Sequence, residues 1–176
     1  MLISSPNIVG EFMKFVSIII GSKSDHEVMS ECVKVLDKFG VLHELVISSA
    51  HRSPERTHSY IKSAEERGAK VFIAAAGMAA HLAGAVAANT TKPVIGVPMK
   101  GGAMDGMDAL LSTVQMPAGM PVATVAMGKA GAVNSAYLSM QILALEDVDL
   151  DVKLKEDRIL KAKKVEIDSL EVEIRL

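Results

Sequence analysis

Two short strings of polar residues each follow an apolar, β-branched run. Residues 21–25 (GSKSD) follow Phe15–Ile20, and residues 49–53 (SAHRS) follow Leu42–Ser48. The first string offers serine hydroxyls, free backbone N–H groups and a helix start, which together can hold a phosphate. The second offers His51, whose imidazole can act as an acid or a base, and Arg52, whose guanidinium binds carboxylate or phosphate. These residue types predict an anion-binding site with one acid/base group.

Each string also has a purely structural interpretation. Ser24 or Asp25 can simply cap the following helix, and this is the favoured interpretation of the first string taken alone. His51 can equally be a loop histidine in a solvated turn. A third string, residues 75–84, has small residues that let backbone groups approach a ligand. His81 within it has apolar neighbours, so we expect a core histidine there.

Several well-known motifs are absent from the sequence. There is no P-loop, no GxGxxG after the first apolar run, no HExxH, no CxxC and no GxSxG. The five histidines lack metal-ligand spacing, so the sequence predicts no metal site. The one cysteine, Cys32, falls on the apolar face of its predicted helix and is expected in the core.

The elements that must position these strings alternate along the chain. We predict helices from Asp25 to Phe39 and from Pro54 to Gly68, with Ser53 as the N-cap of the latter. Five strands and three further helices follow from the apolar runs and spacing: strands Phe15–Ile20, Leu42–Ser48, Val71–Ala75, Pro93–Val97 and Pro121–Val125, and helices Ala79–Ala88, within Asp105–Met116, and Ala130–Leu145. This alternation predicts an α/β protein with a flavodoxin-like, doubly wound parallel sheet and helices on both faces.

The ends of the chain differ from this pattern. Residues 1–13 are expected to be a loose N-terminal extension, and residues 14–147 a single domain. The tail, 148–176, is rich in Lys, Glu and Asp, and we expect a helix outside the sheet that packs on a neighbouring subunit. Its last part, Val165–Leu176, also has strand-like alternation. A glycine-rich segment, Pro98–Asp108, is a candidate lid.

Composition excludes several classes of function. The 176 residues carry a net charge of -2 and only two Tyr, four Phe and no Trp, which argues against nucleic-acid binding. Mean hydropathy is +0.30. Two uncharged windows, Val71–Thr91 and Ala109–Gly128, are long enough to span a bilayer, but their Gly, Pro and polar residues favour strand–turn–helix segments. No secretory signal is recognised, so we expect a cytoplasmic protein without membrane segments.

The strings taken together resemble the class I PurE family. The resemblance extends over residues 14–147 and rests on GSKSD at 21–25, SAHRSP at 49–54, AGMAAHLAG at 76–84, KPVIGVPM at 92–99, a long string at 108–136 and QILAL at 141–145. It implies a three-layer α/β/α fold, a homo-octamer and an isomerase, N5-carboxyaminoimidazole ribonucleotide mutase, of de novo purine (IMP) biosynthesis. The carboxylate would move from the exocyclic nitrogen to ring carbon C4 through bound aminoimidazole ribonucleotide and CO2, without metal, ATP or organic cofactor.

The resemblance also implies roles for individual residues. His51 would be the general acid/base, and Ser22, Asp25 and Arg52 would bind the ribonucleotide. Seven further residues would line the pocket: Ser24, Ser49, Ala50, Ala76, Gly77, His81 and Leu82. The chain departs from the family pattern at His26, which replaces a usual Trp, at Ala83, which replaces a usual Pro, and in the glycine-rich 99–106 loop.

Two other functions fit the same residues. One is a direct carboxylase, a lyase that adds CO2 to aminoimidazole ribonucleotide. The other is a non-catalytic nucleotide-binding module, which the fold alone permits.

Overall fold

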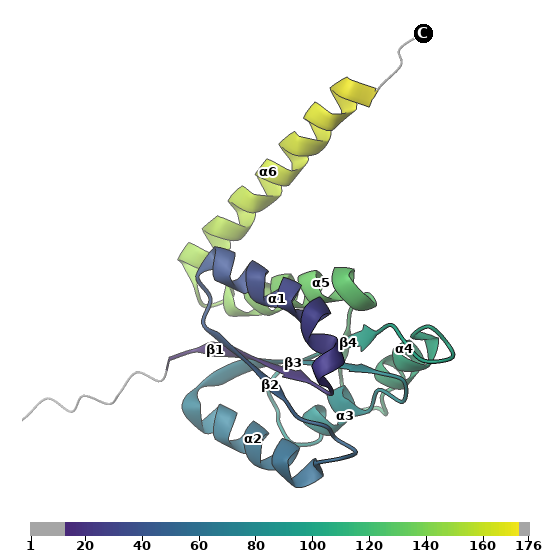
Figure 1. Ribbon diagram of the computed structural model, residues 1–176. Helices are drawn as coiled ribbons and strands as arrows, with labels where there is room; N and C mark the ends of the chain where they lie inside the picture. The colour runs from purple at the N-terminus through teal and green to yellow at the C-terminus, as the bar shows by residue number, and fades with distance from the viewer. Residues whose placement is uncertain (1–12, 173–176) are drawn as a thin grey trace, which may run out of the picture.

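The structure is a computed structural model that describes residues 13–172 (Figure 1). Five parallel strands form one sheet in the order β2-β1-β3-β4-β5. The strands are β1 (Phe15–Ile20), β2 (His43–Ile47), β3 (Ala69–Gly77), β4 (Val94–Met99) and β5 (Ala123–Thr124). This is the strand order of flavodoxin-like folds, so the predicted fold class is confirmed.

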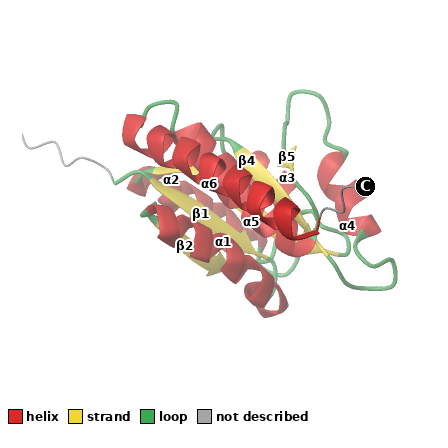
Figure 2. Cartoon of the chain, turned by 90° about the horizontal axis from the view of Figure 1, so that it is seen from above, coloured by secondary structure: helices red, strands yellow, loops and turns green. Residues whose placement is uncertain are grey.

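Helices cover both faces of the sheet, as predicted. They are α1 (His26–Phe39), α2 (Pro54–Arg67), α3 (Leu82–Ala87), α4 (Met107–Val114), α5 (Gly128–Leu143) and α6 (Val148–Val172), and a 3-10 turn, η1 (Lys23–Asp25), precedes α1. Figure 1 shows α1 and α5 on one face and α2 and α3 on the other. Seen from above, α1 and α5 run alongside each other over the strands (Figure 2).

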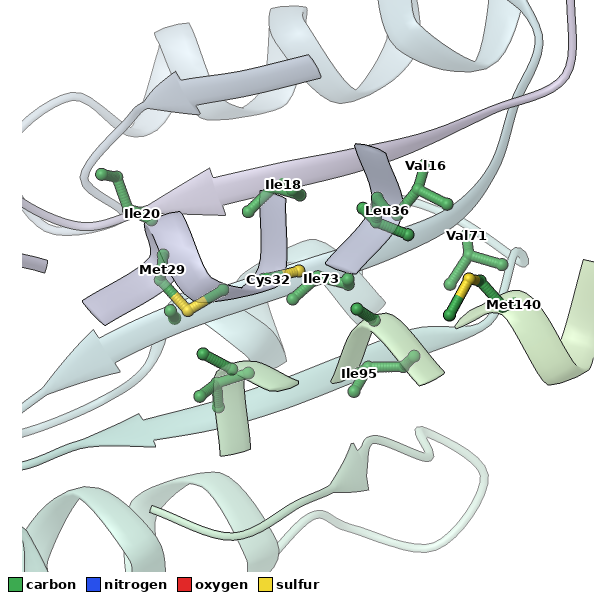
Figure 3. Packing of buried hydrophobic residues seen from close by; sticks show 14 of the residues in the cluster. Val16, Ile18, Ile20, Met29, Cys32, Leu36, Val71, Ile73, Ile95 and Met140 are labelled. Carbon is green, nitrogen blue, oxygen red and sulfur yellow. The ribbon is translucent and has the colours of Figure 1, made fainter. Parts of the chain in front are cut away.

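The alternation of side chains along β1 builds the two halves of the core. Val16, Ile18 and Ile20 face α1, where they pack with Met29 and Leu36 (Figure 3). On the other face, Ile19 and Phe72 pack against Ile61 and Val86 from α2 and α3. Because both faces are covered, the central strands are apolar throughout, and this explains why β1 appears in the sequence as a continuous apolar run.

The boundaries of the helices and strands differ most from the predicted ones around the third and fifth strands. β3 extends to Gly77, beyond the predicted Val71–Ala75, and α3 begins at Leu82 rather than Ala79. The reason is Met78, whose φ of 57° is incompatible with a helix. β5 has two residues rather than five, because it is an edge strand that pairs only with β4 and is preceded by Pro121, which lacks an N–H.

The predicted N-terminal extension lies, apart from Met13, outside the described residues. The tail is one continuous helix to Val172, as predicted. The strand-like alternation of residues 165–172 therefore does not correspond to a strand, and residues 173–176 lie outside the described part of the chain. Leu150, Leu154 and Asp157 of α6 are buried against the body. Beyond them the helix projects away from it, and the large apolar side chains from Ile159 onward are exposed (Figure 1).

Asp157 anchors α6 to the body. Lys38 Nζ in α1 donates to its carboxylate at 2.5 Å, Tyr137 Oη in α5 at 2.8 Å, and Lys161 Nζ lies 2.8 Å away. Burial alone would raise the pKa of this carboxyl, but the hydrogen bonds from Lys161, Lys38 and Tyr137 outweigh it and hold the pKa well below its usual range.

No helix among residues 13–172 combines the length and the apolar composition that crossing a membrane requires. The two uncharged windows contain β3 with α3, and most of α4 with β5, so they form strand, turn and helix segments as predicted.

Candidate active site

A cavity of about 660 Å³ lies at the carboxyl ends of β1, β2, β3 and β4. This is the edge at which doubly wound sheets bind ligands. All eleven site residues expected from the sequence line it: Ser22, Ser24, Asp25, Ser49, Ala50, His51, Arg52, Ala76, Gly77, His81 and Leu82. These eleven residues come from three separate stretches of chain, and residues 100–102 add a fourth, so segments far apart in the sequence meet at one cavity.

The serine turn after β1 is capped by Ser22. Its Oγ accepts a hydrogen bond from the Ser24 backbone N–H at 3.3 Å and another from Ser24 Oγ at 2.9 Å. Asp25 precedes α1 but makes no side-chain capping bond. Asp25 thus occupies the N-cap position of α1, as the structural interpretation expects, but its side chain makes no capping bond there, and the side-chain cap of this segment is Ser22 at the start of η1.

The Asp25 carboxylate is a buried acceptor beside this turn. The residue is 9% exposed, and Ser24 Oγ is 3.5 Å from its Oδ1. Burial raises the pKa of Asp25, while hydrogen bonds with Ser22 and Ser24 partly oppose the shift. The carboxylate thus keeps acceptor capacity for a hydroxyl-bearing ligand, at a cost in folding stability.

Arg52 connects the ends of β1 and β2. Its Nη2 donates to the Gly21 carbonyl at 3.0 Å, and its Nε donates to Ser49 Oγ at 3.4 Å. A guanidinium has five N–H donors, so donors remain for an anion in the cavity. The two bonds hold the side chain in a fixed direction next to the serine turn.

Ser53 occupies the predicted N-cap position of α2, followed by Pro54, but its side chain makes no capping bond. Its Oγ instead donates to the Ser49 carbonyl at 3.1 Å and accepts from the Ser49 N–H at 3.2 Å. These bonds close the short loop that presents His51 and Arg52, so the serine shapes the site rather than the helix end.

His51 and His81 both line the cavity, and their rings are in edge-to-face contact. Their ring centroids are 5.9 Å apart and their planes are at 84°. Both residues are exposed, and neither ring hydrogen-bonds to any residue from 13 to 172. The expectation that His81 is a core histidine is wrong: the turn at Met78 delays the start of α3 and leaves residue 81 at the cavity instead.

The remaining lining residues were not identified as site residues from the sequence. Gly21 follows β1, Met78 and Ala79 follow β3, and Lys100, Gly101 and Gly102 come from the glycine-rich loop after β4. The sequence signal for these loop residues is the glycine-rich composition of Pro98–Asp108, which predicts a lid. Gly102 has φ 69°, and a Cβ there would lie 3.2 Å from Met78 Cγ, so the loop contacts the turn closely.

Of the three departures from the family pattern, the glycine-rich loop contributes to the lining of the cavity, whereas His26 and Ala83 lie outside it. His26 is exposed at the start of α1, and Ala83 is buried in the α3 core. Cys32 is fully buried, as predicted, and desolvation raises the pKa of its thiol to about 11. Over residues 13–172, no cluster of three His, Cys, Asp or Glu side chains could hold a metal ion.

Fold and cavity together define a class: a doubly wound α/β protein with a cavity at the strand ends that is lined by a serine turn, an arginine and two imidazoles. Sequence comparison establishes the family, because the family model for AIR carboxylase matches residues 15–164 of this chain. The chain belongs to this family, and the resemblance drawn from its motifs is confirmed.

Individual relatives are similar over most of the chain. The N5-carboxyaminoimidazole ribonucleotide mutase of Bacillus subtilis is 54% identical over 143 residues, which cover 81% of this chain and 88% of the relative. The enzyme of that name from Escherichia coli is 48% identical, covering 81% and 85%. The crystal structure of Treponema denticola PurE superposes with a TM-score of 0.82 at 27% identity, covering 92% of this chain and 99% of that one.

Proposed function

We propose that this protein is an N5-carboxyaminoimidazole ribonucleotide mutase, an isomerase of purine biosynthesis. The observation that carries the proposal is the convergence of all eleven expected residues on one cavity, in a chain about half identical to mutases of that name. The expected substrate carries a phosphate, a ribose and a carboxylated imidazole, and the cavity offers suitable groups for each of them.

Substrate binding follows from the polar groups at the strand ends. The phosphate would lie against Ser22, Ser24 and the remaining N–H groups of Arg52, because these donors meet where β1 and β2 end. The buried Asp25 carboxylate would accept hydrogen bonds from the ribose hydroxyls. This arrangement leaves the imidazole ring near the two histidines.

His51 would serve as the single acid/base group. The bond between the exocyclic nitrogen and the carboxyl carbon breaks, its electron pair stays on nitrogen, and His51 gives that nitrogen a proton. C4 then attacks the released CO2, a carbon–carbon bond forms, and His51 takes the proton that C4 loses. Atoms and charge balance, and the imidazole returns to its starting state.

The CO2 must stay in the cavity between the two steps. Ala50, Ala76 and Gly77 contribute small, half-buried surfaces beside the histidines. They leave room for a small neutral molecule and offer it no polar partner, while bound substrate would cover the opening. The two reaction steps involve no redox change and no phosphoryl transfer, so we propose that the reaction proceeds without metal, ATP or organic cofactor.

A direct assay tests the function. Purified protein is mixed with N5-carboxyaminoimidazole ribonucleotide in the presence of a chelator and without ATP, and the C4-carboxylated product is followed. We expect turnover under these conditions. Failure to form product would contradict the proposal, and binding without turnover would point to a nucleotide-binding module.

A second candidate is direct carboxylation of aminoimidazole ribonucleotide with CO2, which the name of the matching family model favours. The two reactions share a product and differ in the substrate used. A higher kcat/KM with aminoimidazole ribonucleotide and CO2 than with the N-carboxylated substrate would identify the carboxylase.

We further propose that the protein assembles as a homo-octamer in the cytoplasm, with α6 packed on a neighbouring subunit. Beyond Asp157, α6 exposes Ile159, Leu160, Ile167 and Leu170. A lone helix with several β-branched residues is only marginally stable in water, so a partner surface would stabilise it. Sedimentation velocity of the full chain tests the assembly, and a stable monomer would contradict it. Cell fractionation tests the compartment.

A further inference from the structure

Two cationic side chains line the cavity, and they come from different sides of it. Arg52 follows β2 and Lys100 follows β4. Because β1 and β3 lie between these strands, the ends of β2 and β4 are separated by three strand spacings, about 14 Å. The cavity thus has one positive group toward each end of the sheet edge that it follows.

The two cations differ in how they are held. Arg52 donates to the Gly21 carbonyl and to Ser49 Oγ. Lys100 is exposed, and its ammonium has no hydrogen bond or ion pair with any residue in the described part of the chain. The next residues, Gly101 and Gly102, have no side chains that could screen it from the cavity. Lys100 is therefore a free cation at a site built for an anionic ligand.

The substrate of the proposed function has two anionic groups at opposite ends, the phosphate and the carboxylate on the imidazole. With the phosphate at the serine turn and Arg52, the carboxylate lies toward the other cation. We propose that Lys100 binds the carboxylate carried by the imidazole, and so makes the site prefer carboxylated ribonucleotides over the uncarboxylated one. This inference rests on the proposed function and adds a specificity residue to it.

The chemistry limits what this ion pair can do. It stabilises the substrate and the product, which both carry the carboxylate, and it is lost when neutral CO2 forms. A cation in this position therefore strengthens binding without accelerating the breaking of the bond. Its removal should therefore raise KM without lowering kcat, because the lost contact stabilises the bound substrate more than the transition state.

The experiment compares two ligands that differ only in the carboxylate: the C4-carboxylated product and aminoimidazole ribonucleotide. Lys100→Met should weaken binding of the carboxylated ligand about tenfold, the size of one charge-assisted contact, and change binding of the other by less than about twofold. Lys100→Arg keeps the charge and should restore most of the affinity. Lys92→Met is the matched control, because Lys92 is an exposed lysine that precedes the same strand, outside this cavity.

Both alternative results would overturn the inference. An equal loss for the two ligands would mean that Lys100 contacts the phosphate or ribose, and no loss for either would mean that it takes no part in binding. Wild-type protein that binds neither ligand would overturn the proposed function as well. Thermal unfolding of each variant verifies that Lys100, being exposed, can be replaced without loss of the fold.

Discussion

Two cavities lie at opposite ends of β4, and the larger one is not the candidate site. The cavity at the amino end, about 730 Å³, is lined by Glu65, Asn89, Thr90 and Lys92 among others. The cavity at the carboxyl end is about 660 Å³. Volume therefore does not distinguish the two.

The difference lies in whether the polar groups already have partners. At the amino end, Thr90 Oγ1 donates to Glu65 at 2.5 Å and accepts from the Lys92 N–H at 3.0 Å. The amide of Asn89 accepts from His58 at 2.5 Å and donates to the Ala85 carbonyl at 2.8 Å. These groups stabilise the fold.

At the carboxyl end, the rings of His51 and His81 and the ammonium of Lys100 have no such bonds among residues 13–172. The Asp25 carboxylate is buried there, which lowers the folding stability. Groups left without partners at a concave surface are what a polar ligand requires, so the comparison supports the proposal that the ligand binds at the carboxyl end of the strand.

The largest effect should come from substitution of His51 at the carboxyl end, with His58, which bonds Asn89 near the amino end, as the control. His51→Asn is expected to lower kcat by at least about 10²–10⁴-fold, because proton transfer is lost, while ribonucleotide affinity stays near the wild-type value. His58→Asn, which changes a ring bonded to Asn89, should leave kcat unchanged. Steady-state kinetics and calorimetry measure the two quantities. Near wild-type turnover of His51→Asn would remove this residue from the proposed role.

Arg52→Met should give the next largest effect. Loss of the guanidinium is expected to weaken binding of carboxylated and uncarboxylated ribonucleotides alike, by about 10–100-fold, since both carry the phosphate. Arg56→Met is the control, because Arg56 donates to the Ile47 carbonyl and lies outside the cavity. Calorimetric titration of both ligands checks this, and a loss confined to one ligand would be inconsistent with phosphate binding.

At the amino end, Thr90→Val should affect stability alone. The substitution removes the hydroxyl that bonds Glu65 and Lys92, and we expect the free energy of unfolding to fall by about 1 kcal/mol with kcat unchanged. Urea denaturation and the mutase assay provide the two readouts. A fall in kcat without a fall in stability would break the division between the two cavities.

Asp25→Asn should have the smallest effect on stability, and in the opposite direction. Because burial raises the pKa of Asp25, the ionised carboxylate costs folding free energy at neutral pH, and the neutral amide should raise the free energy of unfolding slightly. Substrate binding should weaken at the same time.

The pH dependence of that difference has a defined sign. A raised native pKa means that the folded state binds the proton more tightly than the unfolded state does. The free energy of unfolding of the wild type is therefore lower than that of Asp25→Asn above the native pKa. This difference disappears as the pH falls below the unfolded pKa, about 3.9. Urea denaturation of both proteins across this range measures it. A difference that grows toward acid pH would contradict the account.

Much of the site could be predicted because parallel strands bring their carboxyl ends to one edge. The residues after Phe15–Ile20 and after β2 therefore had to meet, and Ser22, His51 and Arg52 do line one cavity. Positions that depend on a turn conformation could not be predicted. The positive φ of Met78, which a non-glycine residue rarely adopts, moves His81 out of the core.

Two further features could not be predicted from the sequence: the position of Lys100 at the cavity and the choice between helix and strand at the end of the tail. Lys100 reaches the cavity through a loop whose path depends on left-handed glycines such as Gly102 and Gly106, and their sequence spacing does not determine that path. The end of α6 is exposed, so no burial imposes a helical period on its apolar residues, and the strand-like alternation of residues 165–172 has no structural meaning.

A crystal structure of the protein with the C4-carboxylated ribonucleotide tests the central claim most directly. The account predicts the phosphate against Ser22 and Arg52, the ring beside His51 and the carboxylate toward Lys100. A ribonucleotide bound in the cavity at Thr90, or with its ring out of reach of the His51 imidazole, would contradict it.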